Sequence, residues 1–288
     1  MYERLRYYFP SVGDKDFIPI ENTAEAHNGI YRGKNLTDYF DSGEMSTDIA
    51  AGTFKDIFIG DYIIKTINLP AITYTDKAGA EQTQNAQTFT NVKWYIAGID
   101  SHLKTGNPWT TAHHVVLISA SALQVNVPMN PTNDTTGGYL GSDMWRVHMP
   151  NWANAIKTAF GDAHVLKHRE ALANAINATI ASAAGNSNVG ATSSTTWTDV
   201  EVNIPSEYMV CGAPICSSSW LDAGEWSAQL PLFAHKPYAA GDDGSWFWLR
   251  TVASASRFTF VAGMGGSGII DASSATIYGG IRPYFLLY

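Results

Sequence analysis

The sequence predicts an α+β fold in which strands surround a helical passage and a small N-terminal segment precedes the main domain. Clusters of β-branched and aromatic residues before residue 120 indicate strands. A helical periodicity follows at 152–180, and strand-like runs resume at residue 197. A doubly wound sheet would need a regular alternation of strand and helix, which this order does not have. We therefore expect an N-terminal segment at 1–52 and one main domain at 53–288.

The composition is that of a globular chain with an acidic balance. Of 288 residues, 45% are hydrophobic and 15% are charged, and the formal net charge is -8. Nucleic acids and anionic membranes bind basic patches, so we expect neither nucleic-acid binding nor membrane insertion. The sequence has no apolar run of the length that a signal peptide or a membrane-spanning helix needs. We therefore expect synthesis in the cytoplasm without a signal peptide.

Two short helices are predicted in the N-terminal segment. Asn35–Phe40 and Met45–Ala51 each allow a turn or two of helix, with Thr37 or Ser46 as the N-cap. Neither helix is long enough to be stable alone. We interpret residues 1–52 as an attachment or oligomerisation segment.

The first part of the main domain has the pattern of strands. Residues 54–64 crowd apolar side chains around a Gly60-Asp61 turn, and 92–97 and 114–118 repeat the pattern. The intervening stretch Thr73–Thr90 is rich in Thr, Gln and Ala. It predicts a long exposed hairpin or loop.

Two helices are predicted in the middle of the chain. Six apolar residues recur at intervals of four on either side of a Gly161-Asp162 interruption: Trp152, Ile156 and Phe160, then Leu172, Ile176 and Ile180. We expect Trp152, Ile156, Leu172 and Ile176 to face the sheet and form core. The small polar run 185–196 predicts a loop, after which strands resume at Trp197–Ile204.

Two strings near the C-terminus are the most informative part of the sequence. Trp246–Arg250 and Gly279–Leu287 combine Trp, Phe and Leu as half-buried strands do. We expect Trp246–Arg250 and Ile281–Leu287 to lie in one antiparallel sheet. They resemble the paired closing strands of the C-type-lectin fold in phage and bacterial proteins that are diversified by retroelements. Shorter matches precede them in the same order, at 58–62, 92–94, 115–119, 141–146 and 200–204.

The resemblance implies a C-type-lectin-type domain over 53–288, with a variable segment at about 245–281. Proteins of this group are phage adhesins on the tail or elsewhere on the virion, and they bind a host cell-surface receptor, which is a protein or a glycan. The resemblance also implies a homotrimer that is joined to other virion proteins through its N-terminus. We expect no catalysis and no cofactor.

Two alternatives to a diversified adhesin stay open. One is a virion or cell-surface structural protein of the same fold that is not diversified. The other is an enzyme of the formylglycine-generating type, which shares the general fold and uses cysteines. The reactive cysteines of those enzymes belong to the late part of the domain, whereas Cys216 is the last cysteine here.

The stretch Arg257–Tyr278 has the composition of a contact surface. Large apolar side chains stand among Gly, Ser and Ala without the alternation of a core strand. Aromatic anchors among small adaptable residues are typical of binding surfaces. We predict these ligand-binding residues: Ser245, Phe247, Arg257, Phe260, Ala262, Met264, Ser267, Ile269, Ile270, Asp271, Thr276 and Tyr278. Most of those from Arg257 onward should be exposed and contiguous.

The same region lacks four residue types. From Ser245 to Tyr288 the sequence contains no Asn, Lys, Gln or Glu. By the resemblance, adenines in Asn codons would be rewritten, and the products include neither Lys, Gln nor Glu. Chance in a short β-rich segment is the alternative explanation, and Met264 fits a mutated Asn codon poorly.

A metal site is one possibility in the middle of the chain. His164 and His168 have the spacing of two ligands on one helical face, and Asp162 or Glu170 could supply a third. Ordinary histidines at the start of a helix are the simpler interpretation, and we assign no metal.

Two further pairs have simple structural interpretations. Asp242-Asp243 could offer carboxylates to calcium, but turn chemistry alone explains the string. Cys211 and Cys216 are interpreted as a reduced structural pair, with a disulfide as the alternative.

The remaining candidates are expected to stabilise the fold. Arg250 and Arg282 lie inside the closing strings, where each guanidinium should pair with buried carbonyls or an acid. His113 and His114 must point to opposite faces of a strand. We expect one of these two histidines to be buried and hydrogen-bonded.

Overall fold

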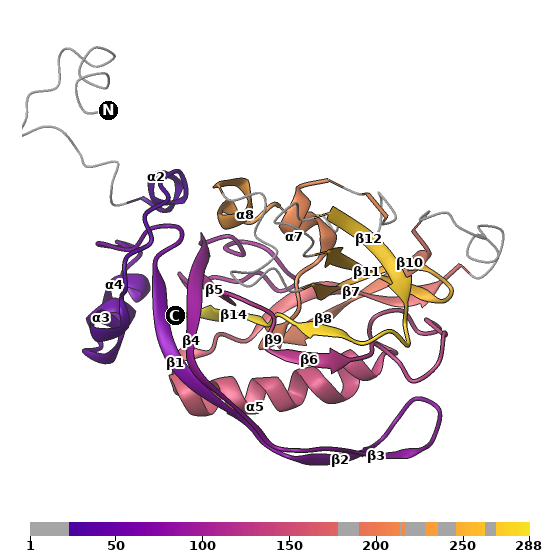
Figure 1. Cartoon of the computed structure of the whole chain (residues 1–288). Coiled ribbons are helices and arrows are strands. Elements are labelled where there is room, and N and C mark those ends of the chain that lie inside the picture. Colours follow the sequence, from indigo (N-terminus) through magenta and orange to yellow (C-terminus); the bar gives the residue numbers. More distant parts are fainter. Residues whose placement is uncertain (1–22, 178–189, 214, 217–227, 236–245, 263–268) are drawn as a thin grey trace, which may run out of the picture.

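The fold is mixed, with mostly antiparallel strands and few helices, and this confirms the α+β prediction (Figure 1). The computed structural model describes residues 23–177, 190–213, 215–216, 228–235, 246–262 and 269–288. Two five-stranded sheets and two separate strand pairs form within these residues. No helix in this part of the chain is long and apolar enough to cross a membrane.

The first sheet is antiparallel throughout. Its strands lie in the order β1-β4-β5-β14-β9, with bounds Tyr62–Leu69, Gln87–Ile99, Val115–Ser119, Tyr284–Leu287 and Val202–Asn203. Every residue of the middle strands β5 and β14 is buried. Their apolar sequences Val-Val-Leu-Ile-Ser and Tyr-Phe-Leu-Leu suit a strand that is covered on both faces. The runs predicted at 92–97 and 114–118 are thus confirmed as strands.

The second sheet contains the region between the closing strings. Its order is β12-β11-β10-β13-β6, with bounds Ile269–Ser274, Arg257–Ala262, Phe247–Ser254, Gly279–Ile281 and Gln124–Val127. β13 runs parallel to β10, with Phe247 opposite Gly280, and the other pairs are antiparallel.

The closing strings form strands, but the prediction that they share one sheet is wrong. Phe247–Arg250 of the first string falls in β10 of the second sheet, whereas the last string divides into β13 in the second sheet and β14 in the first. The division falls at Arg282-Pro283, because Pro283 has no N–H with which to continue the ladder. The chain also passes from the first sheet to the second between β5 and β6. β5 pairs with β14, and β6 pairs with β13.

A hairpin extends the first sheet beyond the body of the protein (Figure 1). β2 (Ile72–Thr75) pairs with β3 (Glu81–Gln84), and together they continue the ribbon of β1 and β4. The turn is closed by Asp76, whose carboxylate accepts from the N–H groups of Ala78 and Ala80, both at 2.9 Å. This confirms the hairpin that the polar stretch predicts.

The first predicted helix is confirmed. α5 (Met149–Phe160) follows a π-helical turn at Met144–His148 and packs against β1 and β9. Trp152 and Ile156 are fully buried on its inner face. The indole of Trp152 donates to Gln124 Oε1 at 3.0 Å, so that the helix is also joined to β6.

The second predicted helix is wrong. Residues His168–Ile176 form strand β7, which pairs antiparallel with β8 (Thr192–Val200). The predicted loop therefore ends before Thr192. His168, Glu170 and Leu172 are buried while their neighbours Arg169 and Ala171 are half-buried, which is the period of a strand. Pairing with β8 outweighs the helix preference of the alanines, because tertiary contacts override intrinsic propensity. Leu172 is still core and Ile176 is partly buried, whereas Ile180 lies outside the described residues.

Between residue 23 and β1 the structure has three short helices: α2 (Ala24–Asn28), α3 (Thr37–Asp41) and α4 (Glu44–Ala50). The last two confirm the helical turns predicted there. The cap assignments are wrong: the N-caps are Leu36 and Gly43, and Thr37 Oγ1 instead accepts from the N–H of Ile64. Leu36 and Met45 are buried in the same core as the sheets, so packing is continuous across residue 52. An attachment role for residues 1–52 stays a prediction.

Candidate ligand-binding site

The frame of the predicted ligand-binding region is strand β10. All eight of its residues are buried, and the indole of Trp248 donates to the carbonyl of Val127 in β6 at 2.8 Å. Phe247, predicted to contact ligand, is 0% exposed and lies under the Arg282 guanidinium at 5.0 Å. That assignment is wrong, because strand pairing on both sides of β10 turns this ring into the core.

Strand β11 is only partly accessible. Phe260 is half-buried, with ring centroids 5.1 Å from Trp246 and 6.3 Å from Trp248. Arg257 is also half-buried and lies opposite Ser274 of β12. The expectation that both are substantially exposed is therefore wrong. Phe260 packs on Trp246 and Trp248 and remains partly accessible.

Among the predicted residues whose side chains are described, the most accessible lies just before β13. Tyr278 is 63% exposed, and its neighbour Ile277 is 45% exposed. Thr276 is half-buried and donates to Asn133 Oδ1 at 3.0 Å. Thr276 and Tyr278 also line a pocket of about 580 Å³ beside the β2–β3 hairpin. The structure thus brings two predicted residues together at an open site.

The remaining predicted residues lie wholly or partly outside the described part of the structure. Ser245, Met264 and Ser267 lie outside the described residues, as does the calcium candidate Asp242-Asp243. The backbone of four others is in β11 or β12, but their side chains lie outside the description: Ala262, Ile269, Ile270 and Asp271. Contiguity of the whole predicted surface stays a prediction.

Close packing explains the two glycines that start β13. A Cβ on Gly279 would lie 2.5 Å from the Trp246 ring, and one on Gly280 would lie 2.4 Å from Cβ of Ala122. Both contacts are shorter than real Cβ atoms make. The exposed tyrosine at 278 is therefore joined directly to a strand whose position is sterically fixed.

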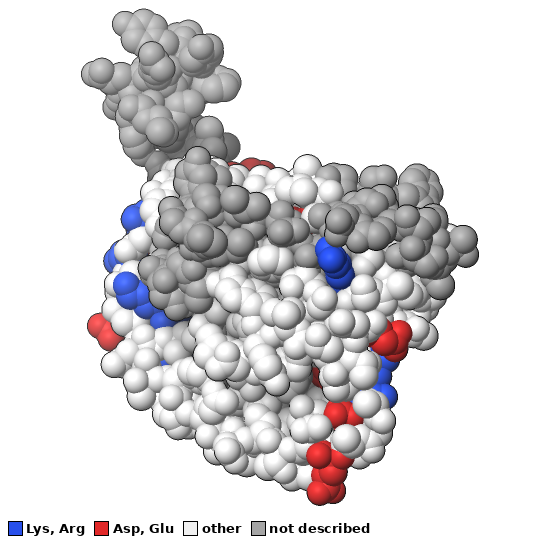
Figure 2. Space-filling model, turned by 45° about the vertical axis from the view of Figure 1, so that its right-hand side comes forward, with Lys and Arg blue, Asp and Glu red and all other residues white. Residues whose placement is uncertain are grey.

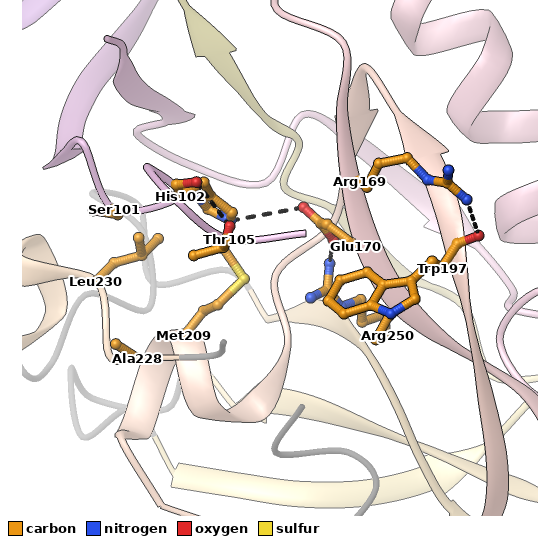
Figure 3. Close-up of a pocket in the computed structure, with 11 residues that line it drawn as sticks. Ser101, His102, Thr105, Arg169, Glu170, Trp197, Met209, Ala228, Leu230 and Arg250 are labelled. Carbon is orange, nitrogen blue, oxygen red and sulfur yellow. Dashed lines mark hydrogen bonds and ion pairs between the residues drawn. The ribbon is translucent and has the colours of Figure 1, made fainter. Parts of the chain in front are cut away.

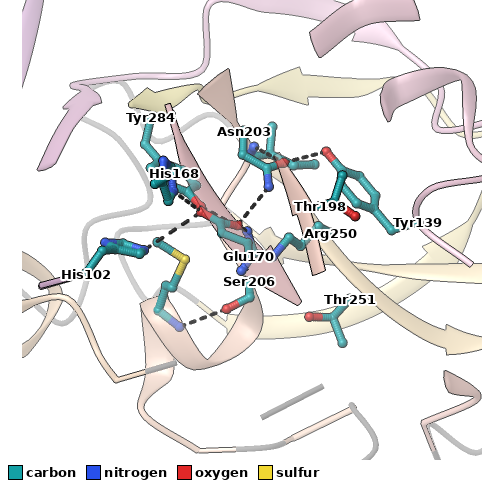
Figure 4. Close-up of polar contacts among 12 residues, drawn as sticks. His102, Tyr139, His168, Glu170, Thr198, Asn203, Ser206, Arg250, Thr251 and Tyr284 are labelled. Carbon is teal, nitrogen blue, oxygen red and sulfur yellow. Dashed lines mark hydrogen bonds and ion pairs between the residues drawn. The ribbon is translucent and has the colours of Figure 1, made fainter. Parts of the chain in front are cut away.

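A buried polar cluster joins β10 to β7 and β14 (Figure 4). At its centre, the Glu170 carboxylate accepts from His168 Nε2 at 2.7 Å and from Asn203 Nδ2 at 3.1 Å. It also accepts from the Arg250 guanidinium and the Tyr284 hydroxyl. Each oxygen of Glu170 thus has two donors, and the acid is fully satisfied.

The geometry of the cluster determines the charge states of its members. Burial alone would raise the pKa of Glu170, but the Arg250 guanidinium and the His168 hydrogen bond outweigh it and hold that pKa well below its usual range. Burial and the neighbouring His168 ring lower the pKa of His102 well below 6.5. The cluster therefore contains an ionised acid, a fixed cation and a neutral His102.

Part of this cluster has the composition of a metal site. His102, His168 and Glu170 bring three ligand atoms within 4.8 Å of one another. His168 and Glu170 were candidates from their spacing, but His164 lies elsewhere, beside Ser46 and Tyr288. The guanidinium of Arg250 already neutralises Glu170 and would repel a cation. The arrangement fits a buried ion-pair network better than a metal centre.

A small cavity adjoins the cluster (Figure 3). It has a volume of about 30 Å³ and is lined by His102, Glu170 and Arg250 on one side and by Met209 and Leu230 on the other. This is room for one or two water molecules, not for a substrate. Nδ1 of His102 is buried without a hydrogen-bond partner in the described residues, and a water in this cavity would satisfy it.

Cys211 and Cys216 are not joined by a disulfide, which agrees with the reduced interpretation. Burial and the nearby Glu207 carboxylate raise the pKa of the Cys211 thiol to about 11. A thiol with this pKa is protonated at neutral pH and is a poor nucleophile.

The predictions for the arginines are confirmed, and one of the paired histidines is buried and hydrogen-bonded as predicted, but both histidines precede β5 and do not lie in a strand. Arg250 pairs with a buried acid, and Arg282 Nε donates to the carbonyl of Ser119 at 2.8 Å. His114 is fully buried and its Nε2 accepts from the backbone N–H of His102 at 3.1 Å, whereas His113 contacts Asp100 near the surface.

Comparison with known proteins returns no neighbour: no protein-family model, curated protein or solved structure matches this chain. The resemblance of its closing strings to the C-type-lectin group therefore rests on the residues alone.

Sequence reasoning missed three members of the buried cluster. His102 lies in a loop between β4 and β5, and Asn203 and Tyr284 were interpreted only as strand residues. The one available signal was the alternation His168-x-Glu170-x-Leu172, which puts an acid and a histidine on the face that carries a core leucine. Nothing local in the sequence connects these residues with His102.

Proposed function

We propose that this protein is a phage adhesin of the C-type-lectin type, which binds a host cell-surface receptor through its closing region. The observation that carries the proposal is a contrast within that region. β10 and β14 are completely buried, whereas Tyr278, between them in sequence, is 63% exposed. A fixed frame with an accessible segment is the arrangement that a variable binding surface needs, because the surface can change without unfolding the frame.

The composition of the segment supports the same proposal. Residues 245–288 contain none of the four residue types that rewriting of Asn codons either consumes or cannot produce. Most of the described surface on the face in Figure 2 is uncharged, and this favours recognition of a receptor over binding of nucleic acid. Homotrimer formation and attachment through residues 1–52 belong to the proposal as well, since several linked sites raise a modest affinity.

The coding DNA and its flanks provide the experiment. The proposal predicts a second copy of the stretch that encodes about residues 245–281, with adenines at the codons for Arg257, Phe260 and Tyr278, and a reverse-transcriptase gene nearby. Sequencing of the flanking DNA measures this directly. Flanks without such a copy would exclude diversification and favour the alternative, a fixed structural protein of the same fold.

The enzyme alternative is disfavoured by the state of the cysteines. The Cys211 thiol is held in its protonated form by burial and by Glu207, and a reactive cysteine needs the opposite surroundings. Under the adhesin proposal, Cys211→Ser changes neither folding nor receptor binding.

A further inference from the structure

One pocket lies mostly outside the closing segment, and the proposed function gives it no role. The hairpin pocket, as we name it, has a volume of about 580 Å³ and lies between the β2–β3 hairpin, β6 and the residues that precede β13. Sites for small ligands in proteins occupy about 300–1,000 Å³. The pocket is therefore large enough for a ligand of several rings.

The hairpin that forms one wall is fixed to the body at its tip. The ammonium group of Lys77 lies 3.0 Å from the Asp134 carboxylate and donates to the carbonyl of Thr136 at 2.7 Å. The backbone N–H of Lys77 donates to Asp143 Oδ2 at 3.0 Å. Because these contacts supplement the strand pairing at the base, both ends of the wall are held and the pocket exists before a ligand binds.

Amide side chains line both walls. They come from the hairpin side as Gln84 and Gln87, and from the opposite side as Gln124 and Asn126. Two further amides are already engaged: Gln82 donates to Asp76, and the fully buried Asn130 donates to the carbonyl of Asp134 and accepts from the N–H of Asp143. An amide carries both a donor and an acceptor, which matches a hydroxyl group, itself both a donor and an acceptor. The Nε2 atom of Gln84 is buried and has no hydrogen-bond partner among the described residues. A polar ligand that accepts a hydrogen bond would satisfy this buried donor.

Aromatic rings lie at two places on the pocket wall. Tyr278 is 63% exposed, and Tyr74 packs edge-on against the buried His148 at 5.7 Å. A tyrosine offers an apolar ring face and a polar hydroxyl, so it can contact a ligand that is polar at its rim and apolar on its faces.

The charges on the pocket disfavour ionic ligands. Among the described residues that line it, none is Lys or Arg, so nothing there would bind a phosphate or a sulfate. Its two carboxylates are already occupied: Asp76 accepts from two backbone N–H groups and Gln82, and Asp143 accepts from Lys77 N–H and lies 3.4 Å from Arg146. Both acids hold the hairpin and leave little capacity for a cation.

We propose that the hairpin pocket binds a neutral oligosaccharide. Hydroxyl groups would exchange hydrogen bonds with the amides from both walls, and the sugar rings would lie against Tyr278 and Tyr74. The proposal does not depend on diversification of the closing segment, because most of the lining comes from residues 74–148.

The experiment measures binding of the full chain to immobilised neutral oligosaccharides of glucose, galactose, mannose and N-acetylglucosamine. Sulfated forms of the same sugars and an oligolysine peptide are measured beside them by surface plasmon resonance. We expect at least one neutral oligosaccharide to bind, and Tyr278→Ala and Gln87→Ala each to weaken it about tenfold or more. Trp109→Ala removes an equally exposed aromatic residue, 64% accessible, that does not line the pocket, and should leave binding unchanged.

Three results would overturn the proposal: binding of none of the neutral sugars, binding of only the sulfated sugars or the peptide, or neutral-sugar binding that both pocket variants leave unchanged. The outcome is separable from that of the adhesin proposal. Flanking DNA without a second copy would exclude diversification and would not affect the pocket proposal. Loss of sugar binding in Gln87→Ala would support the pocket proposal alone, because Gln87 lies outside the closing segment.

Discussion

The guanidinium of Arg250 pairs with the carboxylate of Glu170, 80 residues earlier in the chain, in the interior between β10 and β7. Tyr284 of β14 donates to the same carboxylate and also accepts from Arg250 Nη1 at 2.9 Å. The Glu170 carboxylate thus connects β10, which frames the ligand-binding region, with β7 and β14. The stability of that frame should depend on this pair.

Replacing Arg250 by Met should destabilise the protein by about 3 to 5 kcal/mol, because it leaves Glu170 buried without its cation. Urea unfolding at pH 7 measures the loss. The double variant Arg250→Met with Glu170→Leu serves as the control, since it removes both charges, and it should be more stable than the single variant. A loss below about 1 kcal/mol in Arg250→Met would show that the pair does not hold the frame.

Stability should fall between pH 6.5 and pH 4 because of His148. Burial lowers the pKa of His148 to about 4 in the folded protein, whereas an unfolded histidine has a pKa of about 6.5. Within this window the unfolded chain binds a proton that the folded chain excludes, so stability is complete above pH 6.5 and is lost as the pH falls. The contribution is about 3 kcal/mol.

The variant His148→Gln isolates this effect. It retains a donor for Gln84 Oε1, which lies 3.1 Å from His148 Nδ1, but it cannot be protonated. Urea unfolding at pH 7.0, 5.5 and 4.5 should give a shallower decline for His148→Gln than for the unchanged protein. Parallel declines would mean that His148 does not titrate as its burial predicts.

The substitution Gly280→Ala should destabilise the protein, because it adds a methyl group where β13 packs against its neighbours. A Cβ there would lie 2.4 Å from Ala122 Cβ and 2.8 Å from the carbonyl of Trp246, and overpacking of this kind costs about 1 to 3 kcal/mol. Gly29→Ala is the matched control, because its nearest contact is 3.3 Å and its φ is not positive. Thermal unfolding should separate the two, and equal midpoints would contradict the close packing of β13.

Truncation of Leu172 to Ala should reduce the free energy of unfolding by about 2 to 5 kcal/mol, since the side chain is buried in the core. Asn174→Ala, on the exposed position two residues further along β7, should change it by less than about 0.5 kcal/mol. Denaturant unfolding of the two variants compares them. A similar small effect for both would mean that β7 does not pack as described.

The parts of the fold that the sequence predicts are those in which local pattern and burial agree. Trp152, Ile156 and Phe160 have helical spacing, and α5 buries all three. The stretch Thr73–Thr90 has the composition of an exposed hairpin and forms one. In β7, however, the alanines favour helix while pairing with β8 requires a strand, and that pairing depends on residues more than fifteen positions away.

Only part of the candidate site could be predicted, because the burial of a residue depends on strands that are distant in sequence. Tyr278 stands among small residues and is exposed, but Phe247 looks equally suitable in sequence and is fully buried in β10, between β11 and β13. The hairpin pocket brings Gln84 and Gln124 onto opposite walls. No local pattern connects two amides that belong to different sheets, so the pocket could be found only in the folded protein.

The central claim is that the closing region combines a fixed frame with a surface that tolerates change. Saturation mutagenesis at Thr276, Tyr278, Trp248 and Phe285, with protease resistance as the measure of folding, tests it most directly. We predict that most substitutions at Thr276 and Tyr278 keep the protein resistant, because accessible side chains contribute little to stability. Most substitutions at the fully buried Trp248 and Phe285 should make it sensitive. The claim is contradicted if Tyr278 tolerates no more substitutions than Trp248.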